Sequence, residues 1–173
     1  MQAAPKHIIV NYHYIQDPSP KFSGIFPCSV AEFDKQIKFL KANYKIVFAP
    51  EVLGAAKNNS EEKFCAITFD DGTKDQYQNA LPILKKYKSF GTFFPITSTL
   101  EYRLPVAHKV HILLSRVSVE QLIDEFNNYL VEFHPDLKDR YFIPKDVRLT
   151  NKRLHEKPAA ANFKETLINI PDD

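Results

Sequence analysis

The chain has 173 residues, of which 44% are hydrophobic and 25% charged, a composition typical of a globular protein and not of a disordered one. The 23 Lys and Arg residues against 21 Asp and Glu residues leave a formal net charge of +2, which gives no electrostatic argument for a nucleic acid or an anionic membrane as partner. Two cysteines, Cys28 and Cys65, are too few for a disulfide framework or a four-cysteine zinc site. No apolar stretch approaches about 18 residues, so we expect no membrane span. Because no signal peptide is visible, the expected compartment is the cytoplasm.

The first half of the chain alternates between strand and helix patterns. The β-branched and aromatic residues at 7–14 predict a strand. A capping box then opens a helix predicted over 29–43, and residues 44–48 predict a second strand. Pro50 suits the first turn of a short helix that follows.

The third predicted strand has a different character. Residues 64–69 are almost continuously apolar, which is typical of a strand buried on both faces of a parallel sheet. A helix is predicted over 74–88, with Tyr77 on its buried side and Pro82 at a position that costs a hydrogen bond or kinks the helix. Residues 91–96 predict a fourth strand. Strands that alternate with helices in this way are parallel, so the predicted fold class is α/β.

The pattern changes after Thr97. Residues 98–173 carry helix signals, such as the capping box at Ser118, but no convincing strand. We therefore expect two parts: residues 1–97 with the strand and helix units, and residues 98–173 as a mainly helical insertion or tail of the same domain.

Two adjacent carboxylates stand where the third strand is predicted to end, in the run Thr68-Phe69-Asp70-Asp71-Gly72. Functional sites collect at the carboxyl ends of parallel strands. Gly72 permits a sharp turn, and with that bend one carboxylate can hold a cation while the other accepts a proton. The same residues also suit ordinary turn chemistry and an N-cap for the next helix, so the pentapeptide alone leaves both interpretations open.

This run resembles the first motif of the polysaccharide deacetylases, the NodB-homology family of carbohydrate esterases. The neighbouring segments that are also similar to the family are residues 10–15, 29–40, 80–87 and 91–94. The resemblance covers residues 7–97 and implies the N-terminal part of a distorted (β/α) barrel. It also implies removal of N- or O-acetyl groups from an acetylated sugar or glycan, with a divalent metal ion, usually zinc.

Carried over residue by residue, the resemblance implies that Asp70 is the general base and Asp71 a metal ligand. A metal ion would polarise the acetyl carbonyl and acidify a bound water, whose proton Asp70 would take as the water attacks. His13 lies near the end of the first predicted strand and is a candidate for substrate binding at the same mouth. A histidine simply packed in the strand explains His13 equally well.

The resemblance stops at the second family motif, His-Ser/Thr-x-x-His-Pro, which supplies both histidine ligands and is absent here. His134 precedes a proline, but the residue four positions before it is Leu130. His108 and His111 have a spacing that places two imidazoles on one helix face, although two surface histidines are the simpler interpretation. The three-ligand zinc site is therefore incomplete in this sequence.

Two explanations of the missing motif stay open. The chain is the N-terminal portion of a longer deacetylase with residues 98–170 as an insertion, or it is a catalytically inactive relative that binds carbohydrate or a partner. We favour the first because the predicted sheet is incomplete, and an incomplete sheet would also let two copies pair through its open edge.

Two other enzyme and signalling classes carry acidic residues after a buried strand. Haloacid dehalogenase phosphatases have Asp-x-Asp-Gly-Thr, but here Phe69 stands at the nucleophile position and cannot be phosphorylated. Response-regulator receiver domains have their acidic pair after the first strand, whereas here the pair follows the third. Both classes are therefore disfavoured.

Overall fold

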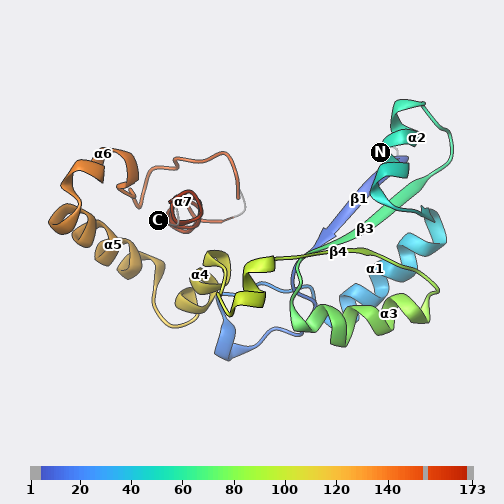
Figure 1. Cartoon of the computed structure of the whole chain (residues 1–173), viewed down its shortest axis with the longest axis horizontal. Helices are drawn as coiled ribbons and strands as arrows, with labels where there is room; N and C mark the ends of the chain where they lie inside the picture. Colours follow the sequence, from blue (N-terminus) through green and yellow to red (C-terminus); the bar gives the residue numbers. More distant parts are fainter. Residues whose placement is uncertain (1–4, 154–155, 171–173) are drawn as a thin grey trace. The chain divides into compact units, whose positions relative to one another are not determined.

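The computed structural model describes residues 5–153 and 156–170 and divides the chain into two compact units. The second unit comprises residues 20–25 and the chain from residue 102 onward, and the first unit comprises the rest. Figure 1 shows the helices and strands in chain order. The predicted role of residues 98–173, an insertion or tail of the same domain, stays a prediction.

The first unit is built on a four-stranded sheet, whose strands are β1 (His7–Tyr12), β2 (Lys45–Ile46), β3 (Phe64–Asp71) and β4 (Thr92–Pro95). β3 is the central strand: β1 pairs with it in parallel along one side, and β2 and β4 pair with it in parallel along the other. The predicted α/β class with parallel strands is confirmed.

Helices cover both faces of the sheet, namely α1 (Val30–Asn43), α2 (Ala49–Lys57) and α3 (Leu81–Lys86) (Figure 1). Because side chains alternate along a strand, Ile67 and Phe69 of β3 join the core that α1 and α3 complete. Ala66 points to the other face and packs with Val52 of α2. Asp70, which follows Ala66 by four residues, shares the α2 face of β3.

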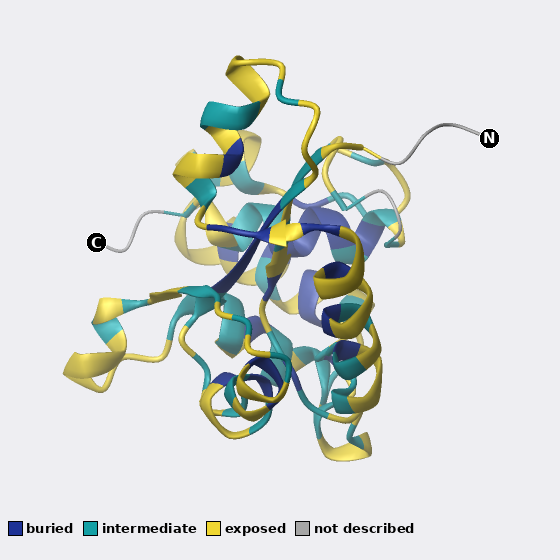
Figure 2. Cartoon of the chain, turned by 90° about the vertical axis from the view of Figure 1, so that its right-hand side faces the viewer, coloured by how far each residue is buried: buried dark blue, intermediate teal, exposed yellow. Residues whose placement is uncertain are grey.

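The helix α1 forms where the capping box predicts it. The Ser29 hydroxyl accepts a hydrogen bond from the backbone N–H of Glu32 at 3.2 Å, which satisfies one free donor of the first turn. Phe33 is fully buried, and its ring lies edge-on to that of Tyr12 at 4.9 Å between centroids. Figure 2 shows the buried residues concentrated along the sheet and on the inward sides of the helices that flank it.

The helix predicted over 74–88 contains a π-helix, η2 (Gln76–Ala80), directly before α3. The backbone N–H of Leu81 bonds to the carbonyl of Gln76 five residues back, and Pro82 follows with no N–H to donate. The wider turn changes which side chains face inward: Gln76 is buried, whereas Tyr77 is 74% exposed. The prediction that Tyr77 lies in the core was therefore wrong.

The second unit is helical over its described residues. Its helices are α4 (Val106–Leu114), α5 (Val119–Phe133), α6 (Lys138–Tyr141) and α7 (Pro158–Ile168), with short 3-10 turns η1 (Pro20–Phe22) and η4 (Pro135–Leu137). A short 3-10 helix, η3 (Thr97–Glu101), ends the first unit. In none of the described parts of the chain is a helix long and apolar enough to cross a membrane.

Two buried asparagines organise the irregular chain between α6 and α7. The side chain of Asn127 exchanges hydrogen bonds with both backbone groups of Ile143, at 2.9 and 3.0 Å. The side chain of Asn162 donates to the carbonyls of Pro144 and Val147 and accepts from the N–H of Leu149. These bonds replace the ladder that a strand would supply, because buried backbone groups require partners.

Charged groups lie close together inside the second unit. Lys164, whose side chain is almost fully buried, forms an ion pair with Glu156 at 2.9 Å, and Arg153 lies 3.7 Å from the same carboxylate. Burial, and then the positive charges of Lys164, His108 and Arg153, lower the pKa of His111 to about 4. At neutral pH His111 is therefore uncharged.

Truncation of the fully buried ring of α1 should destabilise the protein far more than truncation of an exposed one. We expect Phe33→Ala to lower the free energy of unfolding by about 3–5 kcal/mol, because a core phenylalanine leaves a cavity when it is removed. The matched control is Phe39→Ala, on the same helix and 59% exposed, which should change it by about 0.5 kcal/mol or less. Urea unfolding measures both, and equal losses would contradict the assignment of the core.

The pKa of His111 predicts how stability depends on pH. Its folded-state pKa of about 4 lies below the ordinary 6.5, so the stability that neutral His111 supports is complete above pH 6.5 and is lost as the pH falls toward 4. His111→Gln cannot be protonated, so its melting temperature should fall less than that of the wild type over this range. The exposed substitution Lys109→Gln on the same helix is the control. Parallel curves for wild type and His111→Gln would refute the assignment.

Candidate active site

The two carboxylates of the acidic turn lie at the carboxyl end of β3. Asp71 has φ 73° and Gly72 has φ 68°, so two consecutive residues adopt the left-handed conformation and turn the chain sharply. Gly72 is required at its position because an added Cβ would lie 2.6 Å from the Cβ of Pro95 in β4. The chain therefore bends directly after the two adjacent acids.

Asp70 is the better defined of the two acids. Its side chain is 41% exposed, and its Oδ2 accepts a hydrogen bond from Nδ2 of Asn11 at 2.7 Å. Nε2 of His13 lies 3.6 Å from the same oxygen, and the His13 side chain is half exposed. The structure thus brings together Asp70 and His13 from different strand ends, while their predicted roles as base and substrate contact stay predictions.

The side chain of Gln76 is buried and holds the backbone of Asp70 and of His13 together. Its side-chain amide Nε2 donates to the backbone carbonyl of His13 at 2.7 Å and also to that of Asp70. Two further side chains of the same segment hold the chain after β1: Asn79 donates to the carbonyl of Ile15, and Asp75 accepts from its N–H. The η2 segment therefore holds the end of β3 and the segment after β1 in one register.

Tyr14 adds a neutral phenol to the same region. Burial, followed by the negative charges of Asp71 and Asp75, raises the pKa of Tyr14, so its hydroxyl keeps its proton at any physiological pH. The site therefore combines carboxylates with neutral hydrogen-bond donors.

Sequence reasoning missed Asn11, Thr68 and Gln76. Asn11 lies beside Thr68 in the parallel register of β1 and β3, and the hydroxyl of Thr68 donates to Oδ1 of Asn11 at 2.9 Å. The available signal was the alternation of side chains, which places Thr68 on the same face as Asp70. The register that adds Asn11 to this face, and the π-helix that turns Gln76 inward, had no local signal.

The residues present do not by themselves fit a three-ligand metal site. In the described ranges, 5–153 and 156–170, no three His, Cys, Asp or Glu side chains gather closely enough to hold an ion. Asp70, Asp71 and His13 are therefore not a complete ligand set. The rings of His108 and His111, in the second unit, have centroids 6.4 Å apart and also belong to no such group.

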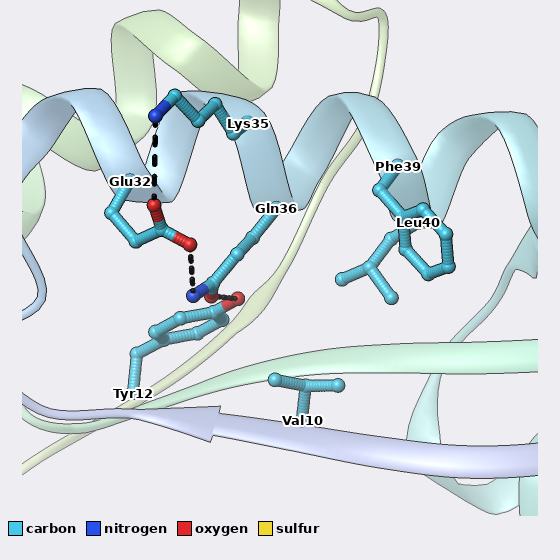
Figure 3. A pocket seen from close by; sticks show the side chains of 7 residues that line it. All are labelled: Val10, Tyr12, Glu32, Lys35, Gln36, Phe39 and Leu40. Carbon is cyan, nitrogen blue, oxygen red and sulfur yellow. Dashed lines mark hydrogen bonds and ion pairs between the residues drawn. The ribbon is translucent and has the colours of Figure 1, made fainter.

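A separate groove of about 410 Å³ runs between β1 and α1 in the first unit (Figure 3). Its polar groups pair with one another: the hydroxyl of Tyr12 donates to Gln36, and the amide of Gln36 donates to Glu32. Neither Asp70 nor Asp71 lines it. The carboxylates at the end of β3 are therefore a more suitable reaction centre than this groove.

The model of the polysaccharide deacetylase family matches residues 57–129. The chain is 30% identical over 138 residues to the poly-beta-1,6-N-acetyl-D-glucosamine N-deacetylase of Staphylococcus aureus, a match that covers 79% of this chain and 45% of that protein. It spans less than half of the length of the first curated relatives it matches.

Two solved structures are also similar. One is the Streptococcus pyogenes deacetylase PplD in complex with acetate, with a TM-score of 0.49 and 23% identity over 95% of this chain and 83% of that one. The other is the de-N-acetylase from Aggregatibacter actinomycetemcomitans, with a TM-score of 0.45 and 24% identity over 70% of this chain and 51% of that one.

The match of the polysaccharide deacetylase family model over residues 57–129 confirms the predicted resemblance. The predicted fold class, an α/β fold of the NodB deacetylase type, is confirmed with it. The match extends past residue 97 into α5, beyond the range 7–97 that the motifs supported.

Removal of the Gln76 amide should weaken the fold at this site. Gln76→Leu keeps the side-chain volume but leaves the carbonyls of His13 and Asp70 without their donor, so we expect a loss of about 2–4 kcal/mol in the free energy of unfolding. Gln78→Leu, at an exposed glutamine of the same π-helix, is the matched control and should stay within about 0.5 kcal/mol of the wild type. Denaturant unfolding compares the two variants. An unchanged free energy of unfolding in Gln76→Leu would show that the two hydrogen bonds from Gln76 do not stabilise the fold.

Proposed function

We propose that this chain carries the acidic part of a hydrolase site that removes N- or O-linked acetyl groups from a carbohydrate. The observation that supports the proposal is the half-exposed carboxylate of Asp70, at the end of a central parallel strand, with Asn11 and His13 at the same oxygen. The match of residues 57–129 to the deacetylase family model supports the same chemistry. The Staphylococcus aureus relative is named for poly-β-1,6-N-acetylglucosamine, so we propose a polymer of N-acetylated sugars as substrate.

The chemistry that this chain's own residues can perform begins at Asp70. As a water oxygen bonds to the carbonyl carbon of the acetyl group, Asp70 takes one of its protons. The bond from that carbon to the sugar nitrogen or oxygen then breaks, the departing atom receives the proton that Asp70 took from water, and acetate and the free amine or hydroxyl are formed. We propose that His13, 3.6 Å from Asp70, contacts the sugar beside the reacting group.

The deacetylase family generally depends on a divalent metal ion. Because the described residues do not complete a ligand set, we assign no step to an ion. We propose Asp71 as the ligand that this chain offers and zinc as the ion, to be tested by addition of the metal. The cytoplasmic location and the pairing of copies through the open edge of β1 are likewise proposals.

A second candidate function is a catalytically inactive carbohydrate-binding fragment with the same fold. The observation that favours it is the lack of a three-ligand cluster among the described residues. Under this alternative the chain binds acetylated oligosaccharides but releases no acetate.

Acetate release from acetylated glucosamine oligomers, with zinc added, separates the two candidates. If Asp70 is the base, Asp70→Asn should lower the rate by roughly 100- to 10,000-fold, because the amide cannot take a proton. The matched control is Asp139→Asn, at an exposed aspartate of α6, which should keep the wild-type rate.

Zinc dependence is tested in the same preparation. Zinc should raise the melting temperature of the wild type, and Asp71→Ala should abolish that rise. A wild type that releases no acetate, ignores zinc and is stabilised by the oligosaccharide would overturn the hydrolase proposal in favour of the binding fragment.

A further inference from the structure

Asn11 lies on the face of the sheet that carries the candidate base. In the parallel register of β1 and β3, Asn11 is the partner of Thr68, and Thr68 and Asp70 are two residues apart on β3. Side chains two residues apart on a strand share a face, so one amide reaches both neighbours. Its Nδ2 lies 2.7 Å from Oδ2 of Asp70 and its Oδ1 lies 2.9 Å from Oγ1 of Thr68.

The direction of this amide follows from the chemistry of its two neighbours. An ionised carboxylate only accepts hydrogen bonds, so the NH₂ end of Asn11 has to face Asp70. Its oxygen then faces Thr68, whose hydroxyl is buried and has one hydrogen to donate. That hydroxyl is also 3.4 Å from the carbonyl of Val10, and the shorter contact is to Asn11. A flipped amide would point its oxygen at the carboxylate and lose the bond to Asp70, so the carboxylate sets the direction of the amide and Thr68 holds its other end.

The hydrogen bond from Asn11 also determines which oxygen of Asp70 can accept a proton from water. Over the described residues, Asn11 and His13 both approach Oδ2. Oδ1 is therefore the oxygen that remains to accept a proton from water. A hydrogen bond to one carboxylate oxygen holds the side chain in one rotamer. The other oxygen then stays within hydrogen-bond distance of the water from which it takes a proton.

We propose that Asn11 is a positioning residue for Asp70 and that the hydroxyl of Thr68 anchors the Asn11 amide in place. This inference rests on the proposed function, in which Asp70 is the base. It adds two residues, Asn11 and Thr68, neither of which touches the reacting atoms. Both act through the carboxylate.

The kinetic test compares variants in the zinc-supplemented acetate-release assay. Asn11→Leu should lower kcat by roughly 10- to 100-fold and leave KM within about twofold, because the base is misplaced while the substrate contacts remain. Its melting temperature should stay near that of the wild type, since Asn11 is exposed. Asn58→Leu, the same change at an exposed residue after α2, is the matched control for kcat.

The contribution of Thr68 is tested by a conservative pair. Thr68→Val keeps the shape and removes the hydroxyl, and it should lower kcat by roughly 3- to 10-fold because the Asn11 amide loses one of its two hydrogen bonds and is held less firmly. Thr68→Ser restores the hydroxyl and should recover much of that loss. If Thr68→Ser and Thr68→Val have the same kcat, the hydroxyl has no role and this part of the proposal is overturned.

An NMR measurement separates this proposal from the proposed function, because it requires no activity. A scalar coupling across the hydrogen bond between Nδ2 of Asn11 and the carboxyl carbon of Asp70 should be present in the wild type and lost in Thr68→Val. Coupling without acetate release would uphold the positioning and overturn the deacetylase function. Acetate release without coupling, together with an unchanged kcat in Asn11→Leu, would uphold the function and overturn the positioning.

Discussion

The first unit depends on the parallel pairing of β3 on both of its sides. β3 is hydrogen-bonded to β1 along one side and to β2 and β4 along the other, and its alternate side chains pack against helices on both faces. A strand in this position has few degrees of freedom, because any shift in register would move buried side chains such as Phe69 out of the core. The residues at its carboxyl end therefore emerge at a defined place, and the acidic turn is built there.

The rigidity of that place comes from polar contacts beyond the strand. Gln76 binds the carbonyls of both His13 and Asp70, so the segment after β1 and the end of β3 move together. Asp71 holds a left-handed backbone that few residues adopt, and such conformations persist where the surrounding structure enforces them. Pro95 of β4 closes the space beside Gly72. A buried amide, a glycine and a proline thus hold the backbone around two partly exposed acidic residues.

The chemistry at this end of the sheet is asymmetric. Asp70 has an orienting amide and a nearby imidazole, whereas Asp71 lies in the turn with the neutral phenol of Tyr14 in its field. The two adjacent carboxylates therefore lie in different surroundings. The second unit contributes a different kind of interior, with buried asparagines and an ion pair between Lys164 and Glu156 in place of a sheet.

Local patterns in the sequence were enough to predict the α/β class, the capped helix α1, the buried strand β3 and the acidic turn after it, because each depends on neighbouring residues. The predicted burial of Tyr77 was wrong because the π-helix changes which side chains face inward. Neither Pro82 nor the spacing of apolar residues predicts a π-helix at this point. The contacts of Asp70 with Asn11 and His13 join residues far apart along the chain, 59 positions in the case of Asn11. Only the tertiary structure decided these contacts, because they depend on the register between two strands that meet through space and not along the chain.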